Sequence, residues 1–212
     1  MADEINRASP RTQSALLQSM QEYQVTIAGH HHDLPAPFHV LATQNPLEQE
    51  GTYPLPEAQL DRFLMQIDVH YPDIDAERRI LVETTGASEA KSKQVLQLDE
   101  LKQMQQLVRH IPVGESVMDA ILKLVRAARP GEADGFEDLA QYIACPGPRA
   151  SQALMLTVRA RALADGRLTP SIDDVMALAE PVLQHRMALT FAARADGKTI
   201  PQLLRDIKAR IA

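Results

Sequence analysis

The spacing of hydrophobic positions changes along the chain, and the change falls near residue 72. Before this point, short apolar runs lie between turn residues, which is typical of strands. The runs Phe38–Ala42 and Phe63–Val69 each predict a strand, and we expect the first to be buried. Gln24–Ile27 and His30–Leu34 flank an Ala-Gly turn and therefore predict a hairpin.

The same part of the chain contains two predicted helices. Ser9 followed by Pro10 is typical of a helix start in which the serine is the N-cap. The apolar positions of this helix repeat with helical spacing: Leu16, Met20 and Tyr23. A short helix is predicted at Glu57–Arg62. Strands and helices together predict an α/β core over residues 1–72.

After residue 72 the hydrophobic period is helical throughout. The predicted helices are Asp75–Thr84, Leu98–Ile111, Ser116–Ala128, Pro148–Asp165, Ser171–Glu180 and a closing helix from Ile200 to Ile211. Two of them have apolar faces made of Leu101, Met104, Val108 and Ile111, and of Val117, Ile121, Leu124 and Ala128. Ser171 begins a capping-box pattern, and Pro181 is expected to kink or restart the helix. Residues 73–212 are therefore a predicted all-α domain.

Composition narrows the class of protein. The chain has 212 residues, 45% of them hydrophobic, and is long enough to bury a core. No apolar run approaches the length of a membrane span and the N-terminus has no signal pattern, so we expect a cytoplasmic protein. A single cysteine, Cys145, excludes an internal disulfide and a multi-cysteine zinc site. Its Pro-Gly-Pro context favours a small apolar filler over a nucleophile.

Charge is unevenly distributed between the two parts. Residues 1–72 carry nine acidic and three basic side chains, whereas the remaining residues carry equal numbers of each. No segment is strongly basic, so the sequence offers no electrostatic footprint for nucleic acid. The change in charge near Pro72 agrees with the predicted domain boundary.

Three features of the first part suggest phosphate chemistry. Asp3 and Glu4 form an acidic pair of the kind that suits Mg²⁺-nucleotide chemistry at a strand end. Asn45 follows the predicted Phe38–Ala42 strand and precedes a proline, which places an amide at the strand tip. Arg62 lies in a short charged cluster. The alternatives are two solvated acids, an Asn-Pro turn, and a local ion pair of Arg62 with a neighbouring carboxylate, either Asp61 or Glu57.

A histidine triplet, His30–His32, raises the question of a metal site, and hence of a metal-dependent hydrolase. The first and third side chains would share one strand face. Adjacent histidines at a hairpin are more often solvated, and no cysteine lies nearby to complete a site. We therefore regard this metal hypothesis as the weaker one.

Several motifs, taken in order, resemble those of the MoxR family of AAA-plus ATPases. They are Ala2-Asp3-Glu4-Ile5-Asn6-Arg7-Ala8, Gln13-Ser14-Ala15-Leu16-Leu17, Ala42-Thr43-Gln44-Asn45-Pro46, the run from Glu50 to Phe63, and Gly147-Pro148-Arg149-Ala150. The resemblance covers nearly the whole chain. It implies the distal part of an AAA-plus α/β core over residues 1–72, followed by an all-α lid over residues 73–212.

The resemblance also implies roles for five residues. Asp3 resembles the Walker B aspartate that holds Mg²⁺, and Glu4 resembles the glutamate that activates the attacking water. Asn45 resembles sensor 1, which contacts the γ-phosphate or this water. Arg62 resembles an arginine finger that acts on the neighbouring subunit's nucleotide. Arg149 resembles sensor 2, in cis or in trans; the alternative is a plain arginine at a helix N-terminus, where the helix dipole disfavours it.

The family's P-loop is absent, because no G-x-x-x-x-G-K-[ST] string occurs, and only Met1-Ala2 precede Asp3. We therefore expect the chain to be the C-terminal part of a longer protein and to be inactive by itself. The resemblance implies ATP and Mg²⁺ as cofactors and a homo-oligomeric ring, which we expect to be hexameric. It also implies chaperone-like remodelling of partners, some with von Willebrand factor A domains. The alternative is a non-catalytic interaction module that joins a ring without hydrolysing ATP.

Overall fold

The computed structural model describes residues 1–45, 51–86, 92–127, 129, 135–144 and 146–211. The first half contains η1 (Ile5–Arg7), α1 (Pro10–Glu22), β1 (Gln24–Ile27), β2 (His30–Asp33), α2 (Glu57–Leu60) and α3 (Ile74–Thr85). The second half contains α4 (Leu98–His110), α5 (Glu115–Arg126), α6 (Glu137–Ala140), β3 (Ile143–Ala144), α7 (Pro148–Ala164), α8 (Ile172–Leu183), η2 (Gln184–Arg186), β4 (Ala188–Leu189), α9 (Phe191–Ala195) and α10 (Ile200–Ile211). Among these residues, no helix is long and apolar enough to cross a membrane.

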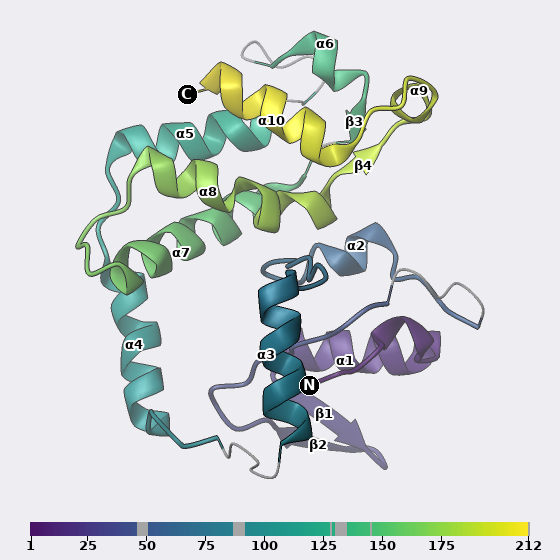
Figure 1. Cartoon of the computed structure of the whole chain (residues 1–212), viewed down its shortest axis with the longest axis vertical. Coiled ribbons are helices and arrows are strands. Elements are labelled where there is room, and N and C mark those ends of the chain that lie inside the picture. Colours follow the sequence, from purple (N-terminus) through teal and green to yellow (C-terminus); the bar gives the residue numbers. More distant parts are fainter. Residues whose placement is uncertain (46–50, 87–91, 128, 130–134, 145, 212) are drawn as a thin grey trace.

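The two halves of the chain gather around different hydrophobic clusters. Figure 1 shows α5 to α10 in the upper part of the view, with α1 and the hairpin in the lower part and α4 along one side. The larger cluster lies among α5, α7, α8 and α10, and includes Ile121, Leu154, Val158, Val175 and Leu204. The smaller cluster is formed by Ile5, Leu17 and Leu55, with partly buried neighbours on α1 and α2. The prediction of helical packing in the second half is confirmed by the larger cluster.

The helix starts that the sequence signalled are present. Ser9 caps α1, and its hydroxyl accepts a hydrogen bond from the Thr12 amide at 3.3 Å. Ser171 caps α8 with a complete capping box. Pro181 lies inside α8, which continues to Leu183 without restarting. The predicted hairpin is present: β1 pairs with β2 in antiparallel orientation, and Ala28 and Gly29, both at positive φ, close it.

The apolar faces predicted for the helices agree less well with the residues that the structure buries. Tyr23 does not join the buried stripe of α1, because it adopts a left-handed conformation that ends the helix and leaves the side chain 57% exposed. Leu17 is the fully buried residue of this helix instead. On α4, Leu101 and Met104 are exposed, and only the end of the predicted face, at Ile111, is buried. Ala128 of the α5 face lies outside the described residues.

The two strands predicted at Phe38–Ala42 and Phe63–Val69 are wrong. The first makes an isolated parallel bridge, Ala2 with Ala42, and Leu41 is 72% exposed. A lone bridge to the two-residue stretch before Asp3 offers too few partners for a strand. The second segment has no strand neighbour in the described chain; instead it donates a hydrogen bond to α8 and accepts hydrogen bonds from η2.

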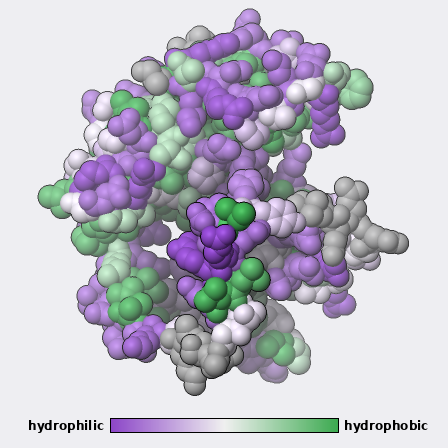
Figure 2. Space-filling view, in the orientation of Figure 1, coloured by the Kyte–Doolittle hydropathy of each residue, from purple (hydrophilic) through white to green (hydrophobic). Residues whose placement is uncertain are grey.

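Not all helices are buried. Neither α3 nor α4 contains a fully buried residue. Figure 2 shows apolar side chains at the surface over both helices, and the exposed ones include Ile80, Leu81, Val82, Leu98 and Leu107. These two helices therefore contribute little to the core of the described chain.

An ionic cluster holds α7 against α8. Asp174, only 2% exposed, accepts two hydrogen bonds from Arg167, both at 2.7 Å, and one from the Ser171 amide at 2.8 Å. Arg161 approaches the same carboxylate at 3.2 Å. The Arg167 hydrogen bonds, together with that amide, lower the pKa of Asp174 to about 2.

We expect Asp174→Asn to lower the free energy of unfolding at pH 7 by about 1–3 kcal/mol, because it breaks charge-assisted bonds to a buried group whose arginine partners are partly screened. The folded pKa lies below the unfolded value of about 3.9, so the stabilisation is present above that value and disappears as pH falls towards 2. Urea denaturation at several pH values measures this. Asp173→Asn, an exposed neighbour in the same helical turn, is the control and should change little. An equal loss of unfolding free energy in both variants would contradict the stabilising role of the Asp174 carboxylate.

Candidate active site

Asp3 and Glu4 lie directly beside the segment that leads to Asn45. The Ala2 amide donates to the Leu41 carbonyl at 2.7 Å, and the Thr43 amide donates to the Ala2 carbonyl at 3.0 Å. This is parallel pairing, so both segments present their carboxyl ends to the same edge. The acidic pair therefore lies at the carboxyl end of this pairing, beside the segment that leads to Asn45.

Thr43 joins the two acidic residues. Its hydroxyl donates to Oδ1 of Asp3 at 2.5 Å and accepts from the Glu4 amide at 2.9 Å. Glu4 also forms an ion pair with Arg7 at 3.0 Å. Thr43 lies within one of the family motifs, but no role was predicted for it. Its position directly after the apolar run Phe38–Ala42 is the sequence signal that could have identified it.

Glu4 has an unusual backbone conformation. Its φ of 47° and ψ of 54° lie in the left-handed region, which non-glycine residues seldom occupy. Such conformations persist where surrounding contacts enforce them, and they gather at functional sites. Here the enforcing contacts are the Thr43 hydroxyl on the Glu4 amide and the Thr43 carbonyl, which accepts from the Ile5 amide at 3.0 Å.

Gln13 supports this turn from beneath. Its side-chain amide is buried, and Nε2 donates to the Ile5 carbonyl at 3.1 Å and to the Tyr53 carbonyl at 2.8 Å. The Tyr53 amide donates in turn to the Asn6 carbonyl at 2.6 Å. One glutamine therefore joins α1, the acidic turn and the segment that precedes α2.

Asn45 is half-buried two residues beyond Thr43. Residues 46–50, which include the proline expected to fix it, lie outside the described chain. The structure therefore places the Asn45 backbone at the expected edge.

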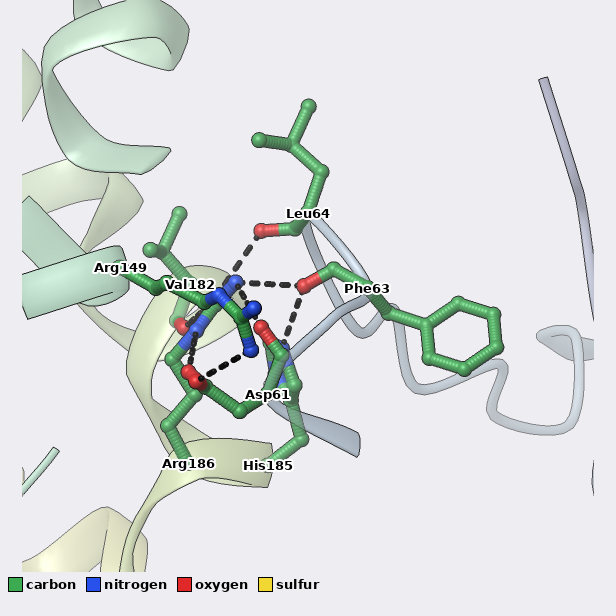
Figure 3. Close-up of polar contacts among 7 residues, drawn as sticks. All are labelled: Asp61, Phe63, Leu64, Arg149, Val182, His185 and Arg186. Carbon is green, nitrogen blue, oxygen red and sulfur yellow. Dashed lines mark hydrogen bonds and ion pairs between the residues drawn. The ribbon is translucent and has the colours of Figure 1, made fainter. Parts of the chain in front are cut away.

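Two arginines meet at the carboxylate of Asp61, and only one of them, Arg149, was predicted. Arg149, at the start of α7, approaches Oδ2 of Asp61 at 3.4 Å, and its side chain is 49% exposed. Arg186 approaches Oδ1 of Asp61 at 3.0 Å, and its side chain is only 2% exposed (Figure 3). Arg62 is exposed, and no ion pair of its side chain is recorded among the described residues. The local ion pair of Arg62 with Asp61 or Glu57 is therefore not what the structure shows.

Arg186 was not predicted, although it makes the most contacts in this region. Besides Asp61, its guanidinium donates to the carbonyls of Phe63 at 2.5 Å, Leu64 at 3.2 Å and Val182. Burial lowers the pKa of Arg186, and the carboxylate of Asp61 opposes that shift.

His185 binds the same segment from the next position. Its Nε2 lies 3.0 Å from the Phe63 carbonyl, which requires a proton on that nitrogen. Its Nδ1 is buried without a hydrogen-bond partner. Burial, together with the charge of Arg186, lowers the pKa of His185 and so favours the neutral ring.

The histidine triplet lies on β2, and all three side chains are exposed. His31 Nδ1 lies 3.0 Å from the Thr26 hydroxyl on the opposite strand. Within the described ranges, no group of three His, Cys, Asp or Glu side chains is arranged to hold a metal ion. Cys145 lies outside these ranges.

Two protein-family models match the chain. The model of the ATPase family associated with various cellular activities (AAA) matches residues 1–65, which include Asp3, Glu4, Asn45 and Arg62. The model of the AAA lid domain matches residues 137–207, which include Arg149 and Arg186. The two matches follow each other in the order that the sequence predicted.

Individual relatives narrow the family. Chaperone MoxR1 of Mycobacterium tuberculosis is 42% identical over 197 residues, which make up 92% of this chain and 52% of that protein. Protein MoxR of Methylorubrum extorquens is 30% identical over 221 residues, covering 97% of this chain and 63% of that protein. The chain belongs to the MoxR family of AAA-plus ATPases.

A solved structure confirms the fold class. The crystal structure of a candidate ATPase from Cytophaga hutchinsonii superposes on this MoxR-family chain with a TM-score of 0.92 at 36% identity, covering 100% of this chain and 64% of that one. The predicted architecture, a partial AAA-plus core followed by a helical lid, is thereby confirmed. The chain spans 52% to 64% of the length of these relatives. The exact boundary at residue 72 stays a prediction.

Proposed function

We propose that this chain supplies the hydrolytic and sensing residues of a MoxR-type ATPase, and that the complete polypeptide hydrolyses ATP. The observation that supports the proposal is the parallel pairing of Ala2 with Ala42, which sets Asp3 and Glu4 beside the segment that leads to Asn45. In α/β folds, ligands bind at the carboxyl ends of parallel strands. By itself the 212-residue chain is expected not to turn over ATP, because no P-loop string occurs in it.

The residues present fit Mg²⁺ and a nucleotide. Asp3 is an exposed carboxylate with Oδ1 bound to Thr43, which leaves Oδ2 for a hard cation or its water shell. When bound, Mg²⁺ would neutralise charge on the β- and γ-phosphates. Glu4 would accept a proton from the attacking water, and its fixed backbone would hold the carboxylate in place. Asn45 would orient this water or the γ-phosphate through its amide.

The arginines are proposed to act on developing negative charge. Arg62 would reach the nucleotide of a neighbouring subunit in a ring, since its side chain is exposed and forms no ion pair within the described residues. Arg149 is half-exposed, and its 3.4 Å contact with Asp61 is long, so it could exchange that carboxylate for a phosphate. Asp61 would not be left without a partner, because Arg186 remains bound to it.

One of the relatives bears the name of a chaperone, which suggests the class of activity that ATP hydrolysis drives. We propose that ATP hydrolysis drives chaperone-like remodelling of partner proteins by a cytoplasmic homo-oligomeric ring of six subunits. Some partners would contain von Willebrand factor A domains.

A Glu4→Gln substitution in the full-length gene product tests the proposal. We expect kcat for ATP to fall by about 10²-fold or more while nucleotide affinity is retained, because the amide keeps the shape of glutamate but cannot accept the proton. Glu22→Gln, an exposed acid at the end of α1, is the control and should leave turnover unchanged. Undiminished turnover in Glu4→Gln would show that the acidic turn does not carry the hydrolysis, and would leave the non-catalytic module as the better description.

A further inference from the structure

The segment around Arg62 is held from two sides: its amides donate back into the turn that ends α2, and the lid binds its carbonyls. Arg186 Nη2 donates to the carbonyl of Asp61 at 3.3 Å and to that of Phe63 at 2.5 Å. These are the residues immediately before and after Arg62. The backbone on both sides of Arg62 is therefore fixed by one buried guanidinium from η2 (Figure 3).

Further contacts extend this attachment along the segment. The Gln66 amide donates to the Pro181 carbonyl at 2.8 Å, and Gln184 Nε2 donates to the Gln66 carbonyl at 3.2 Å. His185 adds its bond to the Phe63 carbonyl. Because the segment forms no strand, α8 and η2 supply the hydrogen bonds that a sheet neighbour would otherwise provide.

The Arg62 side chain itself is in a different situation. It is exposed, and no hydrogen bond or ion pair of its guanidinium is recorded within the described chain. The base of this side chain is thus fixed while its tip is open to solvent. This is the arrangement expected of a cation that must reach a group outside its own subunit.

We propose that Arg186 is a positioning residue for Arg62: it fixes the backbone at Asp61 and Phe63 so that Arg62 is aimed at the neighbouring subunit's nucleotide. The proposal rests on the function proposed above for Arg62. It also implies that the lid of one subunit controls hydrolysis in the adjacent one, because η2 belongs to the lid and Arg62 to the core. A movement of α8 and η2 would move the backbone that carries Arg62.

The chemistry of Arg186 suits this task. Its planar guanidinium contacts the Asp61 carboxylate and two flanking carbonyls at once, and a lysine ammonium cannot reproduce that fork. A purely structural arginine would hold the lid on the core but would not matter to a neighbour's active site. The two roles therefore differ in which subunit loses ATP turnover when Arg186 is replaced.

Mixed rings of the full-length gene product separate these roles. We expect Arg186→Ala to lower ATP turnover by about 10²-fold with nucleotide affinity kept, since a small misplacement of a catalytic group has that cost. Mixing it with Glu4→Gln subunits should restore turnover. The Glu4→Gln subunit has an intact Arg186 and can donate Arg62, while the Arg186→Ala subunit keeps its own Glu4.

Controls keep the outcomes distinct. Arg210→Ala removes another lid arginine that binds a carboxylate, Asp138, and should leave turnover unchanged. Arg62→Ala should be inactive alone and rescued by the same mixing. If Arg62→Ala is rescued but Arg186→Ala is not, or if Arg186→Ala is fully active, the positioning role is overturned while the proposed function stands. If Arg62→Ala is itself active, the finger assignment of Arg62 and the positioning role that rests on it are both overturned, whereas the hydrolytic role of the acidic turn is tested separately by Glu4→Gln.

A milder variant covers the case in which Arg186→Ala does not assemble. Arg186→Lys keeps the charge next to Asp61 but loses the simultaneous carbonyl bonds, so its turnover should lie between those of the wild type and Arg62→Ala. It should recover on mixing with Glu4→Gln. Wild-type turnover in Arg186→Lys, or a loss that mixing does not repair, would overturn the proposal.

Discussion

Arg62→Ala in the full-length gene product should lower kcat for ATP by about 10³-fold or more, because an arginine finger stabilises charge that develops only in the transition state. The affinity for ATP should change little, since Arg62 would contact the nucleotide of another subunit rather than hold its own. Steady-state turnover at saturating ATP, together with equilibrium binding of a fluorescent nucleotide, measures the two effects separately.

The comparison that matters is with an ordinary surface arginine. Arg194, an exposed arginine on α9 with no side-chain contact recorded in the described chain, provides it. Arg194→Ala should leave both turnover and affinity as they are. Arg62→Ala would be expected to behave in the same way if Arg62 were only a solvated side chain, so equal turnover in the two variants would end the finger assignment.

Long helices were predictable because their information is local. The capping serines, the apolar period and the prolines at N1 all lie within one helix, and they correctly place α1, α7 and α8. Six short elements, η1, α6, β3, η2, β4 and α9, were not predicted, because two to five residues are too few to show a period.

The predictions of strands at Phe38–Ala42 and Phe63–Val69 were wrong for a physical reason. An apolar run predicts a strand only if a neighbour exists to complete its backbone hydrogen bonds. The run at Phe38–Ala42 has only the stretch before Asp3 beside it, and the run at Phe63–Val69 has α8 and η2. The same apolar residues therefore lie in extended segments without a sheet.

The residues of the candidate site also fall into two groups, those that local motifs predict and those that only the fold brings together. Asp3, Glu4, Asn45, Arg62 and Arg149 were found because they lie in motifs that resemble a known family. Arg186 leaves no such local signal. Apart from the Val182 carbonyl, its partners are carbonyls and a carboxylate more than 120 residues earlier, and a carbonyl contact imposes nothing on the identity of the residue that offers it. Only the folded chain brings them together.

The two hydrophobic clusters should give this chain two levels of stability. The larger one joins four helices and contains many fully buried side chains, whereas the smaller one has three buried members. Stability of a region follows the apolar surface that it buries. We expect amides in α5, α7, α8 and α10 to exchange with solvent on the order of 10³-fold more slowly than those before residue 72 or in α3. Hydrogen exchange of the soluble chain, followed by mass spectrometry, measures this.

A matched pair of core substitutions shows whether the clusters are independent. Leu154 and Leu17 are each 0% exposed, the first in the larger cluster and the second in the smaller one. Each leucine-to-alanine change should cost about 2–5 kcal/mol where the cavity forms. Leu154→Ala should accelerate exchange across the four lid helices, while Leu17→Ala should affect α1 and the acidic turn and leave those helices protected. Uniform acceleration by either variant, or equal protection of both halves in the wild type, would mean that the chain unfolds as one unit. The contacts of Arg186 and His185 would then couple the stability of the two clusters.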